Sequence, residues 1–100
     1  MIMTFCKAAT FDEAEDVFTK CIDSHPMLPI FLVGGGGNGK TMLVNKHYAH
    51  LEQAQRVVRR DGGSVLANNH SAVYEVTEMN QVCPTQPSHV IDMSAISFAP

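Results

Sequence analysis

Apolar and polar residues in the first third of the chain follow a spacing that predicts an amphipathic helix. Apolar residues recur at helical spacing from Phe11 to Ile22, and acidic residues fall between them. Thr10 and Glu13 form a capping-box pattern, in which Thr10 caps the helix and Glu13 lies in its first turn. His25 precedes a proline, which pushes it out of the helical region, so we expect the helix to end there.

Short apolar runs bounded by turn-forming residues predict strands in three places. The clearest run covers residues 28–33, where Pro29 is tolerated because it stands near the start of a strand. The other two runs cover residues 64–69 and 89–94. Strands separated by helical segments predict an α/β fold with a short parallel sheet and an N-terminal helix.

A second helical pattern follows the first strand candidate and predicts a helix over residues 40–59. The Asp-Gly-Gly segment at 61–63 supplies the stop. Three arginines near its end, Arg56, Arg59 and Arg60, are expected to interact with the helix dipole, and an arginine that acts in another subunit is the alternative.

The segment 71–81 fits two structures. It predicts either a short helix capped by Ser71 or a strand through residues 73–77. Periodicity does not separate these two interpretations, because the apolar run is short.

Bulk properties fit one small globular domain. The chain has 100 residues, of which 45% are hydrophobic and 17% charged, and its net charge is −3. That charge gives no general attraction to nucleic acid. The three cysteines show no C-x-x-C spacing, which favours reduced thiols in a cytoplasmic setting. No apolar run approaches the roughly 20 residues that span a bilayer, so we expect no membrane partner.

Residues 34–41 carry the most specific chemical pattern in the chain. Their sequence GGGGNGKT fits the phosphate-binding loop G-x-x-x-x-G-K-[ST] at every fixed position. Glycines let backbone N–H groups turn around a phosphate, because no Cβ blocks the approach. Lys40 would place its charge on the phosphates, and the Thr41 hydroxyl would help to hold Mg²⁺. The expected nucleotide-binding residues are Gly34, Gly35, Gly36, Gly37, Asn38, Gly39, Lys40 and Thr41.

The alternative for this segment is a flexible glycine connector. Its place between a predicted strand and a predicted helix favours phosphate binding.

A phosphate loop of this kind also needs a carboxylate that organises Mg²⁺, usually at the end of an apolar strand. Asp92 follows such a run, so the expected metal ligands are Thr41 and Asp92. The alternative for Asp92 is a carboxylate that caps a turn or faces water. Glu75 or Glu78 would serve instead if their segment folds back toward the loop. No residue is identified as the base that activates water, so the catalytic residue is unknown.

The loop sequence at Gly36 to Thr41, after an apolar strand, resembles the phosphate loop of the superfamily-three helicases. These are replication ATPases of small DNA viruses, large DNA viruses and plasmids, and the resemblance covers residues 30–44. It implies a small three-layer P-loop NTPase-like domain, ATP binding by residues 34–41, a hexameric ring and translocation on single-stranded DNA. The chain departs from the family in lacking a clear acidic pair after a long apolar strand.

Length limits what this domain can do alone. A working NTPase of this class needs about five parallel strands with helices on both faces, whereas the sequence suggests roughly three. We therefore expect residues 1–100 to form a single P-loop NTPase-like domain that is incomplete, either as a fragment or as a reduced relative that borrows structure from neighbours.

The expected function is Mg²⁺-dependent ATP binding in a replication-type ATPase. The expected partners are a nucleotide and a homo-oligomer or larger assembly, in the cytoplasm of a host cell or in a virion if the protein is viral. One alternative is a small nucleotide or metabolite kinase. The other is an inactive structural or accessory protein that retains a phosphate loop.

Overall fold

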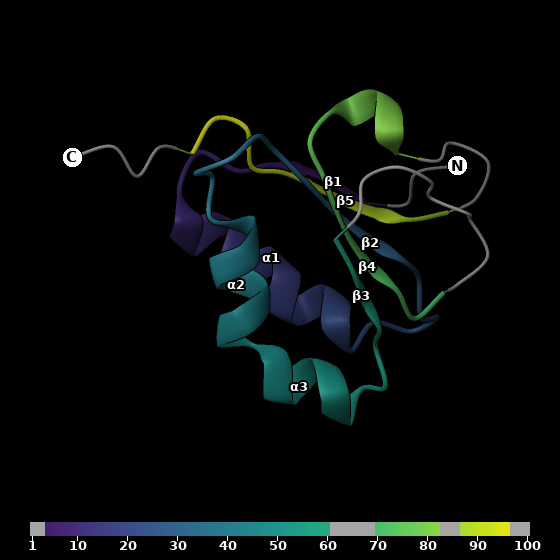
Figure 1. Cartoon of the computed structure of the whole chain (residues 1–100). Helices are drawn as coiled ribbons and strands as arrows, with labels where there is room; N and C mark the ends of the chain where they lie inside the picture. The colour runs from purple at the N-terminus through teal and green to yellow at the C-terminus, as the bar shows by residue number, and fades with distance from the viewer. Residues whose placement is uncertain (1–3, 61–69, 83–86, 97–100) are drawn as a thin grey trace.

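Five parallel strands form a sheet in the computed structural model of this chain, which describes residues 4–60, 70–82 and 87–96 (Figure 1). The strands are β1 (Thr4–Lys7), β2 (Ile30–Val33), β3 (Val58–Arg59), β4 (Val73–Val76) and β5 (His89–Asp92). The helices are α1 (Phe11–Ile22), α2 (Lys40–Lys46), α3 (Tyr48–Gln53) and the short 3-10 helix η1 (Met79–Gln81). The spatial order β1-β5-β2-β4-β3 puts β2 at the centre. The α/β class and the parallel sheet expected from the sequence are confirmed.

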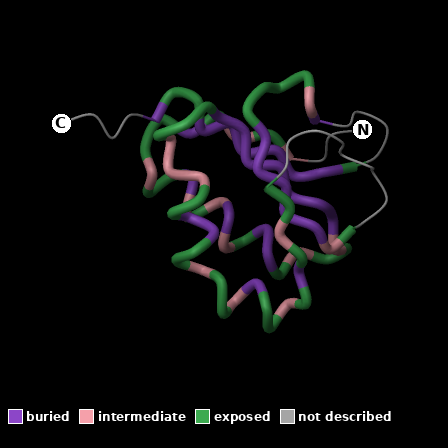
Figure 2. Tube along the Cα trace, in the orientation of Figure 1, coloured by how far each residue is buried: buried purple, intermediate pink, exposed green. Residues whose placement is uncertain are grey.

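Burial explains why β2 is a continuous apolar run, and why β4 and β5 are apolar except for Glu75, His89 and Asp92. Every residue of β2, β4 and β5 is buried, as Figure 2 shows along these strands. Such a sequence is typical of parallel strands, which are covered on both faces. β1 lies at one edge of the sheet, and its residues alternate between half-buried and exposed.

All three α-helices pack on one face of the sheet. Their buried side chains share a core cluster with inward-facing strand residues, including Phe18 of α1, Leu43 of α2, Leu51 of α3 and Leu32 of β2. The helices lie together below the sheet in Figure 1. None of the helices in the described part of the chain is both long and apolar enough to cross a bilayer.

A second apolar cluster covers the opposite face of the sheet. The rings of Phe31 and Tyr74 stack there with their centroids 4.9 Å apart, and Val82 packs into the same cluster. No α-helix within the described residues contributes to this cluster. Of the three layers expected, the described residues therefore contain the sheet and one helical layer.

Helix α1 begins as its capping pattern predicts. The Thr10 hydroxyl accepts a hydrogen bond from the Glu13 amide at 3.2 Å, which satisfies one of the amides left free in the first helical turn. The helix ends at Ile22, before His25.

The single helix expected over residues 40–59 is wrong, because two short helices, α2 and α3, take its place and the second ends at Gln53. His47 leaves helical geometry, with φ −110° and ψ 22°, and separates α2 from α3. Gln55 then adopts a left-handed φ of 60°, which turns the chain toward β3. The β-branched residues Val57 and Val58 favour an extended chain, and pairing of β3 with β4 stabilises it.

The segment 71–81 forms strand β4 followed by η1, so its strand alternative is the correct one. β1 and β3 were not expected, because β1 mixes polar with apolar residues and β3 has two residues. The sheet therefore has five strands where roughly three were expected. The strand expected at 64–69 and the helix stop at 61–63 lie outside the described residues.

Arg56 joins the end of α1 to the entry of β2. Its guanidinium is buried and donates to the carbonyl oxygens of Cys21 at 3.1 Å, Ile22 at 3.0 Å and Leu28 at 2.9 Å. The last carbonyls of a helix have no partner within the helix, so Arg56 satisfies two carbonyls of α1. It therefore caps α1, whereas the sequence suggested an interaction with its own helix.

His89 is buried at the start of β5. Its Nε2 lies 3.0 Å from Ser24 Oγ, while its Nδ1 has no hydrogen-bond partner among the described residues. Burial, reinforced by the positive charge of Arg56, holds the pKa of His89 below its ordinary value. The folded protein therefore keeps this ring neutral at pH values where the unfolded chain already binds a proton.

We expect His89 to make the protein less stable as the pH falls below about 6.5, the ordinary histidine pKa. There the unfolded chain binds a proton that the folded chain does not, so stability falls by at most about 1.4 kcal/mol per pH unit until the folded-state pKa is reached. Urea unfolding between about pH 7.5 and pH 5 should show a steeper loss for the wild type than for His89→Gln, which gains no charge. Parallel stability curves for the two proteins would contradict this account.

Candidate functional site

The glycine-rich loop, residues 34–39, connects the central strand β2 to helix α2. The Gly34 amide donates to the Val76 carbonyl at 3.0 Å, which extends the β2–β4 pairing beyond Val33. Helix α2 begins at Lys40. The loop thus lies at the carboxyl edge of the parallel sheet, where open α/β sheets bind their ligands. The strand, loop and helix expected around this sequence are all present.

Backbone geometry accounts for glycine at two positions of the loop. Gly37 and Gly39 have φ values of 82° and 87°, a region that is unfavourable for a residue with a Cβ. The Asn38 side-chain amide donates to the Ile96 carbonyl at 2.7 Å, which fastens the tip of the loop to the segment after β5. Asn38 was identified from the sequence as a loop residue, but this contact was not.

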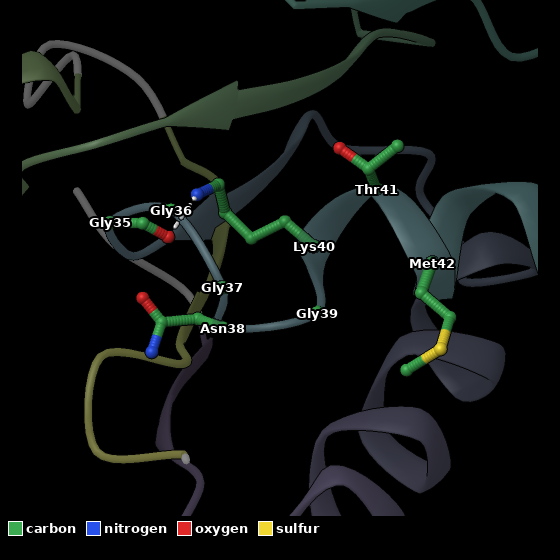
Figure 3. A pocket seen from close by; sticks show the side chains of 8 residues that line it. All are labelled: Gly35, Gly36, Gly37, Asn38, Gly39, Lys40, Thr41 and Met42. Atoms are coloured by element: carbon green, nitrogen blue, oxygen red, sulfur yellow. Dashed lines mark hydrogen bonds between the residues drawn. The ribbon is translucent and has the colours of Figure 1, made fainter. Parts of the chain in front are cut away.

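A pocket of about 260 Å³ lies against the loop and is lined by residues 35–42 (Figure 3). A Cβ built at Gly36 or Gly37 would meet no atom within 4 Å, so the middle of the loop is open. Apart from Met42, the lining consists of backbone and polar side chains. Lys40 is the one charged side chain in this lining, which suits an anionic ligand.

Lys40 reaches back across the loop. Its Nζ donates to the carbonyl oxygens of Gly34 and Gly35, the latter at 3.0 Å, and Figure 3 shows the side chain extended toward Gly35. Burial lowers the pKa of Lys40, and the negative charge of Glu75 opposes that shift. The pocket therefore contains a partly desolvated cation whose present partners are neutral carbonyl groups.

The hydroxyl of Thr41 contacts a buried carboxylate on the neighbouring strand. Thr41 Oγ1 donates to Glu75 Oε1 at 2.8 Å. Glu75 belongs to β4 and pairs in register with Leu32 of β2, so its side chain projects toward the helical face beside α2. The sequence offered Glu75 and Glu78 as alternatives, and Glu78 instead caps η1.

The second oxygen of Glu75 is held by Arg60. Arg60 Nε donates to Glu75 Oε2 at 2.8 Å, and its Nη2 donates to Asn45 Oδ1 at 2.9 Å. The Glu75 side chain is 6% exposed and that of Arg60 is 51% exposed. The charge of a buried carboxylate is therefore compensated by a half-exposed guanidinium. Neither Asn45 nor this role of Arg60 was identified from the sequence.

Asp92, the carboxylate expected to bind metal, lies at the end of β5. Its Oδ1 accepts hydrogen bonds from the amide and the hydroxyl of Ser94, at 3.0 and 2.6 Å. Alternation along β5 places its side chain on the same face as Val90, away from the helices. Asp92 therefore occupies the turn-capping position that was its alternative, and Glu75 is the carboxylate that contacts Thr41 among the described residues. A metal role for Asp92 stays a prediction.

Two histidines contact acidic side chains of α1 and its C-cap. His47 Nε2 lies 2.8 Å from Glu15 Oε2, and His50 Nε2 lies 2.7 Å from Asp23 Oδ2. Within residues 4–60, 70–82 and 87–96, no three His, Cys, Asp or Glu side chains gather closely enough to hold a metal ion. A divalent cation beside Thr41 would therefore need further oxygen ligands from an accompanying anion, as Mg²⁺ commonly has.

Comparison of the chain with protein-family models, with curated proteins and with solved structures finds no match. Loop amides and the Lys40 cation suit an anion, whereas the Thr41 hydroxyl and the Glu75 carboxylate are the oxygen ligands that Mg²⁺ prefers.

We expect Gly37→Ala to destabilise the folded protein by about 1–2 kcal/mol, the cost of a left-handed backbone for a residue with a Cβ. Gly36→Ala is the matched control, because a Cβ fits at both positions and Gly36 has no left-handed φ. Urea unfolding of both variants measures the difference. Equal stabilities would show that the loop does not hold the conformation described.

Proposed function

We propose that the glycine-rich loop binds the phosphates of a nucleoside triphosphate together with Mg²⁺, with ATP as the expected nucleotide. The contact between Thr41 Oγ1 and Glu75 Oε1 is the observation that carries this proposal. A glycine-rich connector with no ligand would not need a buried carboxylate beside the residue that ends the GKT sequence. In P-loop NTPases a hydroxyl and a carboxylate meet in this way to hold Mg²⁺.

Each group in the site has a role in this proposal. The loop amides and Lys40 bind phosphate oxygens, and Lys40 would exchange its carbonyl partners for phosphates. Thr41 and Glu75 hold the cation, which neutralises the charge of the phosphates when it is bound. Asn38 keeps the tip of the loop in place through its bond to Ile96.

The fold adds support to the proposal. Five parallel strands meet the strand number that a P-loop NTPase needs, and the loop follows the central strand at the carboxyl edge of the sheet. The α-helices of the described residues cover one face of that sheet, whereas the class has helices on both. A P-loop NTPase-like domain is therefore the finer fold that we propose. A place in a replication-type ATPase rests on the resemblance of residues 30–44 alone.

The proposal concerns binding of the nucleotide and not its hydrolysis. The carboxylate at the site, Glu75, is bonded to both Thr41 and Arg60, which leaves it poorly placed to activate water. If the wild type binds no nucleotide, the alternative of an accessory protein that retains the loop takes its place.

We expect Lys40→Ala to weaken ATP binding in the presence of Mg²⁺ by more than about tenfold, equivalent to about 1.4 kcal/mol. The variant loses the cation that neutralises the phosphates, so affinity falls without a change in fold. Titration calorimetry with ATP and with GTP measures this effect. Lys20→Ala is the control, because Lys20 is exposed on α1 and pairs with Asp16. Unchanged affinity in Lys40→Ala would remove the proposal.

A further inference from the structure

We propose that Arg60 is a positioning residue that orients Glu75 for Mg²⁺, a role that rests on the proposed function. The hydrogen bonds of Arg60 go to Glu75 and Asn45. Arg60 acts through Glu75, whose Oε2 it binds at 2.8 Å while Oε1 faces Thr41 at 2.8 Å. Arg60 thus binds one oxygen of the carboxylate, and Thr41 binds the other.

Because Glu75 is buried, its negative charge needs partners that compensate it. Its side chain is 6% exposed, and a carboxylate in such surroundings is costly unless a cation or several donors compensate it. Arg60 supplies a full positive charge through a planar group whose donors have fixed directions. A bond to Oε2 therefore also fixes the plane of the carboxylate and the direction of Oε1.

A second anchor distinguishes Arg60 from an ordinary surface ion pair. Its Nη2 donates to Asn45 Oδ1 at 2.9 Å, and Asn45 lies one helical turn after Thr41 on α2. Arg60 consequently links the end of β3 to β4 and to the same helix face that carries Thr41. Half-exposed pairs without such support contribute little.

Loss of this linkage should affect the metal more than the nucleotide. Without Arg60, Glu75 is free to leave the geometry in which Oε1 meets Thr41, whereas the loop amides and Lys40 stay in place. The effect of Mg²⁺ on ATP affinity should therefore fall, and the affinity for ATP without Mg²⁺ should stay nearly constant.

The test is titration calorimetry of ATP with and without Mg²⁺ for the wild type and Arg60→Gln. We expect the ratio of the two affinities to fall at least about fivefold in Arg60→Gln, with metal-free affinity unchanged within about twofold. Arg59→Gln is the matched control, because it removes the same charge from an exposed neighbour on β3. Asn45→Ala removes the second anchor and should lower the ratio in the same direction by less.

The outcomes separate this inference from the proposed function. A wild type that binds no ATP would overturn the proposed function. Wild-type binding with the full effect of Mg²⁺ retained in Arg60→Gln would overturn the role of Arg60 alone. Wild-type binding that ignores Mg²⁺ would also overturn it, while phosphate binding by the loop would stand. If thermal unfolding shows that Arg60→Gln does not fold, an unchanged ratio in Asn45→Ala would overturn the inference.

Discussion

Parallel pairing of β2 with β4 is the constraint on which the candidate site depends. Leu32 lies opposite Glu75 in this pairing, and Val33 lies opposite Val76. Because side chains alternate between the faces of a strand, a slip of one residue would move Glu75 to the face away from α2. The register therefore determines whether a buried carboxylate meets the hydroxyl of Thr41 or lies on the opposite side of the sheet.

Packing of helix α2 against the sheet positions Thr41, the other residue of this contact. Helix α2 has seven residues, which is too short to be stable alone in water. Leu43 and Val44 are fully buried against the sheet, and each such side chain contributes about 1.5–3 kcal/mol. Thr41 lies on the first turn of the helix that these residues anchor, so the apolar core fixes the position of a polar group in the proposed site.

Local patterns predicted the parts of this structure that local physics determines. The Thr10 cap, the apolar run of β2 and the GGGGNGKT loop each depend on residues close together in the sequence, and each lies where it was expected. The bonds of Glu75 to Thr41 and Arg60 join segments far apart in the chain, so no local pattern could reveal them. The sequence therefore indicated the loop and favoured Asp92 as its carboxylate, with Glu75 or Glu78 as the alternative, whereas the structure brings Glu75 to Thr41.

The most direct test of the account is a double-mutant cycle between Thr41→Val and Glu75→Gln, with calorimetric affinity for ATP in Mg²⁺ as the readout. If the two side chains hold one cation, the second substitution should lower the affinity little once the first has been made. The account predicts a coupling energy of at least about 1 kcal/mol. Losses that add within about 0.5 kcal/mol would contradict it, because the hydroxyl and the carboxylate would then act independently of each other.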